Sequence, residues 1–369
     1  MKRLYLDHAA TTPITETVAE KMRSWSSGLI GNPSSLHADG RSAKNAIDEA
    51  REILASHLGA LFGEITFTGS GTEASNLAIF GTAFQALASG DQRRKFVFSA
   101  AEHHCVLHTA DRLRLLGFEV VIIPVDRYAR AVDPASYIDE NTLLVAVMHA
   151  NNELGTLNAS FDKKGARLLI DGVQTLGHFP LNVDELDADF LLLSAHKIGG
   201  PKGIGALYCR SGVLIEPLIV GGGQERDQRA GTESVEAIVG FGEAVRTLRY
   251  SGSEACDAFW NTVGDEVIRS VPPEIPTIGN IAHFRVPGIN ADNLLIKLDR
   301  LGISASSGAA CSSGSIEPSH VLFACGYTEA ECKQGIRFSF GSDQSGEDGV
   351  EAGNRLKQAI SEINRDRGC

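Results

Sequence analysis

The feature that most constrains the fold is a series of short apolar runs, each bounded by turn-forming residues. These runs are apolar at successive positions, which is typical of strands buried on both faces of a parallel sheet. Helical patterns separate several of them, so the sequence predicts an α/β domain with a mainly parallel seven-stranded sheet. The predicted strands are Ile65–Thr68, Phe96–Ser99, Val120–Val125, Leu143–Met148, Leu168–Ile170, Phe190–Leu193 and Ala206–Cys209.

Helical spacing appears before the first of these strands. Apolar residues recur three or four positions apart between Ala43 and Leu58, and Gly59 is a typical helix stop. The pattern predicts a helix that packs one face on the sheet.

After about residue 250 the pattern changes to mixed helices and strands around a Pro-rich stretch, Val271–Pro276. We predict a large domain over residues 14–250. A smaller α+β domain would comprise residues 251–369 together with an N-terminal arm, residues 1–13. Its predicted elements are a helix near Cys256–Val271, strand Ile281–Val286, helix Asp292–Leu301, strand Ile336–Phe340 and a helix near Glu351–Ile363.

Composition excludes several classes of function. The formal net charge of -12 argues against direct binding of nucleic acid, which requires a basic surface. No run of about 18 apolar residues is present, and the N-terminus has no signal-peptide pattern, so we expect no membrane association. The seven cysteines show no C-x-x-C pairing, which favours free thiols in the cytoplasm and no metal site.

The turn Gly69–Thr72 lies between a predicted strand and a predicted helix. Glycines let backbone amides turn inward, and a helix N-terminus with a hydroxyl group can bind phosphate. An ordinary strand-to-helix turn would have the same residues, and both interpretations stay open on this evidence.

Two further strands end in residues suited to a single cofactor. Asp171 directly follows the strand at Leu168–Ile170, where a carboxylate could hold the protonated ring nitrogen of pyridoxal 5'-phosphate (PLP). Lys197 follows the strand at Phe190–Leu193, and a lysine at the edge of a buried pocket can form a Schiff base and act as a base. Lys202, in the turn, fits a surface lysine better. Taken singly, Asp171 fits a loop cap better than a cofactor contact.

Polar residues also follow the strands at Phe96–Ser99 and Leu143–Met148. His103 could lie flat on an aromatic cofactor, with neighbouring His104 as the alternative, and Asn152 is a further pocket candidate. Cys311 lies among small residues in a Ser/Gly-rich loop, where a thiol is accessible enough to react. Composition alone leaves its reactivity open.

Together these segments resemble the group I cysteine desulfurases (NifS/IscS-like), fold-type I PLP enzymes of the class-V aminotransferase family. The resemblance extends over nearly the whole chain, from Tyr5–Pro13 to Gly335–Gly341. Its most specific parts are Ser194–Lys197 and Cys311–Leu322, the latter resembling the long sulfur-carrying loop of this group. It implies the aspartate aminotransferase-like PLP-transferase fold.

The resemblance also implies roles for individual residues. Lys197 would bind PLP covalently, Asp171 would pair with the ring nitrogen, Gln174 with the ring hydroxyl, and His103 would stack on the ring. The implied phosphate contacts are Gly71, Thr72, Ser194, His196 and, from a neighbouring subunit of a homodimer, Thr232. The implied substrate contacts are Asn32, Asn152 and Arg337.

The implied reaction transfers sulfur from L-cysteine to Cys311 as a persulfide and releases L-alanine. A sulfur-acceptor protein, for iron–sulfur cluster assembly or another thiolation pathway, would receive it. The chain departs from the family pattern at His8, where Asn or Tyr is commoner, and in Leu157–Ala166, which is shorter than usual and predicts a surface helix reduced to a turn or two.

Two other functions stay possible on the same fold, because a fold does not fix a function. One is a different PLP reaction, such as aminotransfer or selenocysteine cleavage. The other is a binding or scaffold protein without turnover. The Cys311 loop favours sulfur transfer over aminotransfer, which has no use for a mobile thiol.

Overall fold

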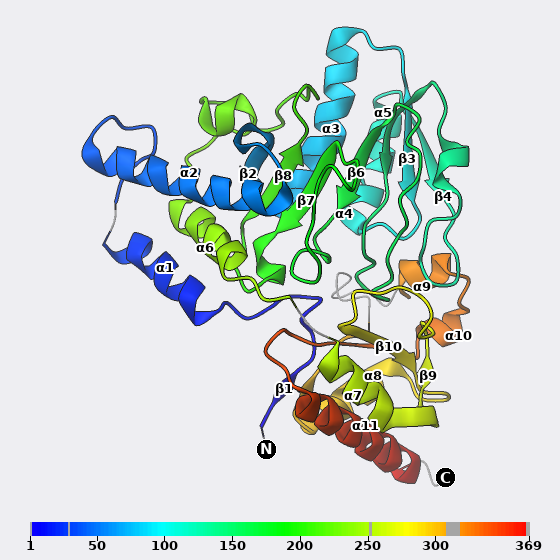
Figure 1. Ribbon diagram of the computed structural model, residues 1–369. Helices are drawn as coiled ribbons and strands as arrows, with labels where there is room; N and C mark the ends of the chain where they lie inside the picture. Colours follow the sequence, from blue (N-terminus) through cyan, green and yellow to red (C-terminus); the bar gives the residue numbers. More distant parts are fainter. Residues whose placement is uncertain (1, 29, 251–252, 308–317, 367–369) are drawn as a thin grey trace.

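The computed structural model describes residues 2–28, 30–250, 253–307 and 318–366. Its main sheet has the strand order β2-β8-β7-β6-β5-β3-β4 (Figure 1). Strand β8 is antiparallel to both neighbours and the other pairs are parallel, which confirms the mainly parallel seven-stranded sheet. The strands are β2 Ile65–Thr68, β3 Lys95–Ser99, β4 Glu119–Ile123, β5 Thr142–Ala146, β6 Arg167–Asp171, β7 Phe190–Ser194 and β8 Gly205–Cys209.

Helices cover both faces of this sheet. Helices α3 (Gly71–Ser89), α4 (His104–Leu107) and α5 (Ala110–Leu115) lie on one face, where α3 contributes most of the helical apolar contacts. Helices α2 (Ala38–Leu58) and α6 (Val235–Arg246) pack on the other face, and α1 (Glu16–Ser27) packs on α6.

Helix α2 ends at Gly59, where φ is +68°, as the sequence predicts. Strand β4, however, is not buried on both faces as predicted. Its Glu119 is exposed and its Ile122 is 40% exposed. The reason is its position at the edge of the sheet, where β3 is its one strand neighbour.

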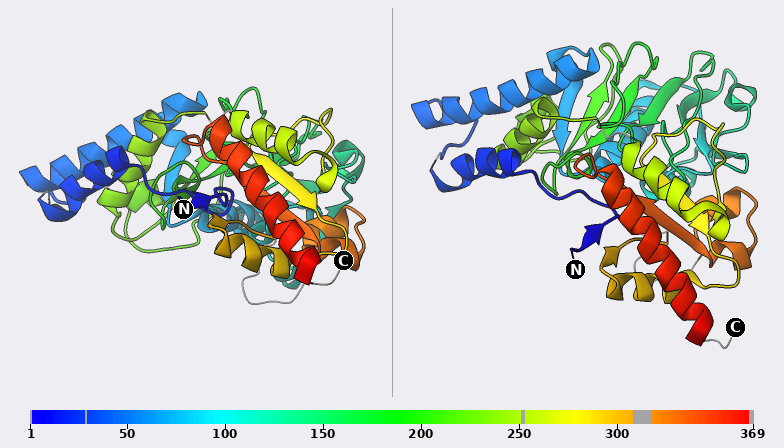
Figure 2. Two further views of the ribbon diagram at one scale, coloured as in Figure 1. Left: turned by 90° about the horizontal axis from the view of Figure 1, so that it is seen from below. Right: turned by 60° about the horizontal axis from the view of Figure 1, so that its bottom comes forward.

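A second region contains the N-terminal arm and the elements after residue 252 (Figure 2). A three-stranded antiparallel sheet has the order β12-β10-β9, and α11 lies against α7. The N-terminal arm joins this region because β1 pairs in parallel with β11. Its elements are β1 Leu4–Tyr5, α7 Glu254–Val263, β9 Ile268–Arg269, β10 Ile281–Arg285, α8 Ala291–Arg300, β11 Ile303–Ser304, α9 His320–Ala324, α10 Glu329–Cys332, β12 Gly335–Ser339 and α11 Gly346–Asp366.

Leu4 and Leu6 of the arm share one apolar core with residues of α7, α8 and α11. The exact domain division stays a prediction. Short 3-10 helices complete the structure: η1 Phe62–Glu64, η2 Pro134–Tyr137, η3 Ala195–Lys197, η4 Gln224–Asp227 and η5 Gly264–Glu266. No helix in the described part of the chain is long and apolar enough to cross a membrane.

Two predicted helices differ from the structure. The helix expected near Cys256–Val271 ends at Val263, because Gly264 adopts a φ of +53° and the chain turns toward β9. The segment Leu157–Ala166 contains no helix, only one hydrogen-bonded turn before β6, in which Ala166 N donates to Lys163 O at 2.8 Å. The prediction of a short helix there was wrong.

Candidate active site

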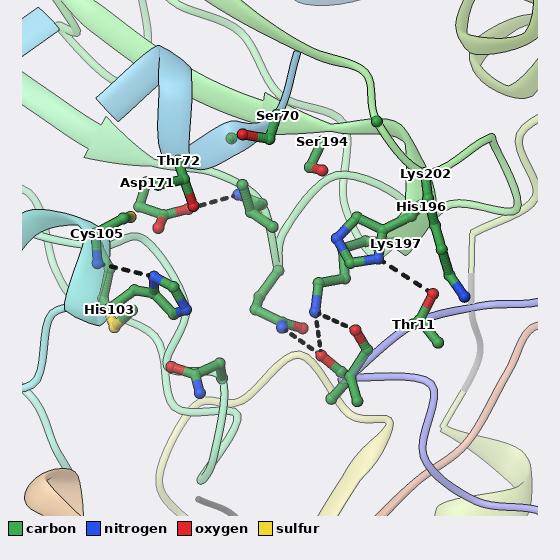
Figure 3. Close-up of a pocket in the computed structure, with 18 of the residues that line it drawn as sticks. Thr11, Ser70, Thr72, His103, Cys105, Asp171, Ser194, His196, Lys197 and Lys202 are labelled. Carbon is green, nitrogen blue, oxygen red and sulfur yellow. Dashed lines mark hydrogen bonds between the residues drawn. The ribbon is translucent and has the colours of Figure 1, made fainter. Parts of the chain in front are cut away.

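A cavity of about 460 Å³ lies where the carboxyl ends of the parallel strands meet the N-terminal arm and β12. Ligands of α/β sheets gather at this edge because the strand-to-helix turns leave polar groups there. Ten of the predicted site residues line this one cavity: Gly71, Thr72, His103, Asn152, Asp171, Gln174, Ser194, His196, Lys197 and Arg337. Figure 3 labels Thr72, His103, Asp171, Ser194, His196 and Lys197 among them.

One end of the cavity is formed by the first turn of α3, with hydroxyl groups around it. Ser70 caps the helix by accepting a hydrogen bond from Glu73 N at 3.1 Å. A Cβ atom at Gly71 would lie 3.3 Å from Val173 Cγ2, so glycine is the residue that fits this close approach without crowding. Amides at a helix N-terminus, with the hydroxyl of Ser194 nearby, form a site suited to phosphate.

Asp171 lies at the end of β6, where the sheet buries its carboxyl group. Its Oδ1 accepts a hydrogen bond from Val173 N at 2.9 Å. Burial raises the pKa of Asp171 to about 6, and the positive charge of Lys197 opposes this rise. A carboxylate held in this way gains from a cation placed beside it, such as a protonated ring nitrogen.

Glu102 is a second buried acid behind the cavity. Its Oε1 accepts a hydrogen bond from Met148 N at 2.6 Å, which joins the turns after β3 and β5. Burial raises the pKa of Glu102 to about 8. We therefore expect a neutral carboxyl group at neutral pH, and we assign it a structural role.

Lys197 projects from η3 into the cavity, and the N-terminal arm supplies its partners. Lys197 Nζ donates to the carbonyl oxygens of Ala9 and Ala10, the latter at 2.9 Å. Ala9 O also accepts a hydrogen bond from Gln174 Nε2 at 2.9 Å. His196 Nδ1 lies 3.2 Å from Thr11 Oγ1. The motif at residues 5–13 belonged to the family resemblance, but no sequence pattern indicated that its backbone would contact Lys197.

His103 lines the cavity, and its ring is held by the turn into α4. His103 Nδ1 accepts a hydrogen bond from Cys105 N at 3.1 Å. Burial and the charge of Lys197 lower the pKa of His103 to about 4, so the ring is neutral at pH 7. A neutral imidazole is suited to stacking on an aromatic cofactor.

The alternative candidate, His104, packs elsewhere. Its ring stacks on His108 with 4.5 Å between centroids, and lies 4.2 Å from the ring of His320. It does not line the cavity that holds Lys197. Cys105 does line it, which the sequence analysis missed. Burial raises the pKa of the Cys105 thiol, so this group stays protonated.

Arg337 lies in β12 and approaches the cavity from the side opposite the main sheet. Its side chain is 2% exposed. Nη1 donates to Asn152 O at 2.7 Å, and Nη2 donates to Asp7 Oδ1 at 2.9 Å. A buried, oriented guanidinium is well suited to bind a carboxylate. The contact with Asp7 was not predicted.

Three predicted site residues do not join the cavity. Asn32 and Thr232 are exposed and line no part of it, and Cys311 lies outside the described residues. The location of Thr232 is compatible with the implied contact to a neighbouring subunit. Lys202, interpreted as a surface lysine, is exposed but lines the cavity near His196 (Figure 3).

Comparison with known proteins identifies the fold and the chemistry together. The model of the aminotransferase class-V family matches residues 4–352. The chain belongs to this family.

Within the family, the chain groups with the cysteine desulfurases. It is 41% identical over 368 residues to a cysteine desulfurase IscS from Dictyoglomus turgidum, covering 94% of this chain and 92% of the relative. A solved NifS-like protein superposes with a TM-score of 0.86 at 32% identity, covering 97% and 99% of the two chains. SspA in complex with cysteine gives a TM-score of 0.82 at 35% identity, covering 91% and 98%.

Class-V aminotransferases depend on PLP, and the cavity fits that cofactor. The first turn of α3 is suited to bind the phosphate, and Asp171 is suited to pair with the ring nitrogen. Lys197 is suited to form a Schiff base with the aldehyde. In the described part of the chain, no group of three or more His, Cys, Asp or Glu side chains could hold a metal ion.

Proposed function

We propose that this PLP-dependent cysteine desulfurase converts L-cysteine to L-alanine and carries the released sulfur as a persulfide on Cys311. The observation that carries the proposal is the meeting of Lys197, Asp171 and Arg337 around one cavity. These residues supply a base, a counter-ion for the ring nitrogen and a binding group for an α-carboxylate. An amino acid held by both its amine and its carboxylate would have its Cα fixed between them.

PLP, when bound, supplies an aldehyde that captures the substrate amine and a ring that withdraws electrons from Cα. Asp171 would hold a proton on the ring nitrogen, and His103 would contact the ring as a neutral group. Lys197 Nζ takes the proton from Cα. Its carbonyl partners in the arm, Ala9 O and Ala10 O, would hold the ammonium group formed in this step.

In the sulfur-transfer step the thiolate of Cys311 attacks the substrate sulfur. An S–S bond forms as the C–S bond breaks, and the electron pair of the C–S bond stays on the carbon skeleton. Cβ takes up one proton, Cα regains the proton held by Lys197, and L-alanine leaves, so the step needs no external oxidant.

The residues on either side of the undescribed segment support an encounter between Cys311 and the cavity. Ser306 O accepts a hydrogen bond from Arg337 N at 2.7 Å. On the other side, Ser319 Oγ donates to Glu153 Oε2 at 2.6 Å. Both ends of the segment are therefore attached beside the predicted carboxylate-binding group.

The active unit would be a homodimer in the cytoplasm, with Thr232 contacting the phosphate bound by the partner subunit. Thr232 is exposed, and nearby Arg229 is anchored to Glu73 of α3 by a 2.8 Å ion pair. Five described cysteines are free thiols, which fits a reducing compartment. A sulfur-acceptor protein would then take the sulfur atom from the persulfide on Cys311. Separately, Asn32 would contact the substrate from its exposed loop.

The test is mass spectrometry of the PLP-loaded enzyme after brief exposure to L-cysteine. One added sulfur atom on the peptide containing Cys311, with equimolar L-alanine and sulfide on reduction, is expected. Cys311→Ala should keep the cofactor absorbance and lose sulfide release, with Cys105→Ala as the matched control for a thiol in the cavity. Undiminished sulfide release from Cys311→Ala would contradict the proposal, and formation of pyruvate from alanine without sulfide would favour aminotransfer.

A further inference from the structure

The guanidinium group of Arg337 already has a carboxylate partner in the structure. Arg337 Nη2 lies 2.9 Å from Asp7 Oδ1, and the two residues are 330 positions apart in the chain. The Asp7 side chain is 22% exposed, whereas that of Arg337 is 2% exposed. The partner of the buried cation is therefore a half-buried anion of the N-terminal arm.

Arg337 keeps unused donors for a second anion. A guanidinium has five N–H groups, and the structure pairs Nη1 with Asn152 O and Nη2 with Asp7. Its Nε is buried and has no hydrogen-bond partner among the described residues. An incoming carboxylate would find donors on Arg337, but it would also meet the charge of Asp7.

The other titratable groups around Arg337 do not supply this negative charge. Burial raises the pKa of Glu153, which favours its neutral form. Burial and the charge of Arg337 lower the pKa of His283 to about 3, so its ring is neutral. Burial also raises the pKa of Tyr5. Among the described residues, Asp7 is the carboxylate within ion-pair distance of Arg337.

We propose that Asp7 is a resident carboxylate partner of Arg337. When the substrate binds, Asp7 must share the guanidinium with the α-carboxylate of the substrate or be displaced by it. Asp7 would thus be a positioning and specificity residue that weakens binding of amino-acid substrate and product. The inference rests on the proposed function, because it assumes that Arg337 binds the carboxylate of an amino acid. Two anions on one guanidinium repel each other, and the energy of this repulsion opposes ligand binding.

This arrangement has a consequence for turnover. L-Alanine, the product, carries the same α-carboxylate as L-cysteine, so a cation without a resident partner would retain it. Asp7 offers Arg337 an immediate replacement partner when the product leaves. The ion pair therefore limits product inhibition at the expense of substrate affinity.

Asp7→Asn tests the inference, because asparagine keeps an oxygen acceptor for Arg337 Nη2 but removes the charge. PLP-loaded enzyme is titrated with L-alanine while the cofactor absorbance is followed. We expect the dissociation constant for L-alanine to fall about tenfold. The KM for L-cysteine should fall, whereas that for cysteamine, which has no carboxylate, should stay within about twofold.

Tyr5→Phe is the matched control on the same arm. Tyr5 Oη donates to Asp7 O and Thr11 O, so the variant disturbs the arm but keeps the Asp7 carboxylate. It should leave the dissociation constant for L-alanine within about twofold. A second measurement uses cofactor-free protein: propionate should raise the melting temperature of Asp7→Asn more than that of the wild type.

An unchanged affinity for L-alanine in Asp7→Asn would overturn the inference, as would an equal gain in affinity for cysteamine. An equal effect of Tyr5→Phe would overturn it too, because the cause would then be displacement of the arm. The L-alanine titration requires no sulfur transfer. A wild-type enzyme that binds L-alanine but forms no persulfide would contradict the proposed function and leave the role of Asp7 intact.

Discussion

Asp171 and Arg337 face the same cavity from two differently built sides. On the sheet side, Asp171 ends β6 and pairs in register with Leu192 of β7, three residues before the start of η3, which ends at Lys197. On the arm side, Arg337 of β12 is held by Asp7 and by a single backbone carbonyl of Asn152. Strand ladders hold the backbone on both sides, since Arg337 itself pairs with His283 of β10, but the guanidinium on the arm side is oriented by contacts with distant segments.

The difference shows how the site divides its tasks. Groups at registered strand ends cannot move without breaking the ladder, which suits a cofactor that stays bound through every turnover. The arm-side contacts of Lys197 and Arg337 are exchangeable hydrogen bonds and one ion pair. Such contacts suit groups that must change partners as substrate enters and product leaves.

The largest expected effect is on the sheet side. Lys197→Ala should lower sulfide release from L-cysteine by about 10³-fold or more, because the base and the covalent anchor of PLP are both removed. Borohydride reduction followed by denaturation should then leave no PLP on the variant, whereas it fixes PLP to the wild type, and absorbance spectroscopy measures this. Lys202→Ala, in the same cavity, is the control. An equal loss in that variant would contradict the assignment of the base.

A smaller effect is expected from Arg337→Lys on the arm side. Lysine keeps the positive charge but cannot bind a carboxylate with two parallel hydrogen bonds, so kcat/KM for L-cysteine should fall about 100-fold. The cofactor spectrum should not change, because Arg337 lies away from the predicted ring contacts. A changed spectrum with an unchanged KM would show that the two sides do not divide the tasks as described.

On the sheet side, Asp171 should make the free energy of unfolding of the cofactor-free protein depend on pH. Burial raises the pKa of Asp171 to about 6. A carboxyl group with a raised pKa binds its proton more tightly in the folded state, so the free energy of unfolding falls as pH rises from about 4 to about 6. The loss should be about 2–3 kcal/mol.

Urea denaturation of the cofactor-free protein across this pH range measures the effect. Asp171→Asn should lose roughly half of the decrease between about pH 4 and pH 6, because Glu102, whose pKa burial raises from 4.5 to about 8, contributes to the decrease both below and above pH 6. An identical profile in Asp171→Asn would mean that the carboxyl group is better solvated than its burial indicates.

The smallest effect is expected from removing one anchor of the arm. Tyr5→Phe deletes the hydrogen bonds to Asp7 O at 3.2 Å and Thr11 O at 2.9 Å. The free energy of unfolding should fall by about 1 kcal/mol, as measured by denaturant titration. A loss of several kcal/mol would show that the arm is as rigidly built as the sheet.

Local sequence patterns were enough to predict the seven strands, within two residues at each end, because a buried strand leaves a continuous apolar run. The same is true of Asp171 and Lys197, which follow such runs directly. Arg337 and Thr232 became candidates through family resemblance, since neither lies in a local pattern that points to a cavity. The exposure of β4 could not be predicted, because an edge position depends on the order of strands in space.

The sequence by itself determined the fold class, the PLP chemistry and the polar residues at the strand ends. The tertiary structure decided which of two adjacent histidines enters the cavity, and it brought Asp7 to Arg337 and the carbonyls of Ala9 and Ala10 to Lys197. The physical reason is that a strand end is encoded by its neighbours in the chain. Every residue has a backbone carbonyl, and an ion pair across 330 positions leaves no local trace.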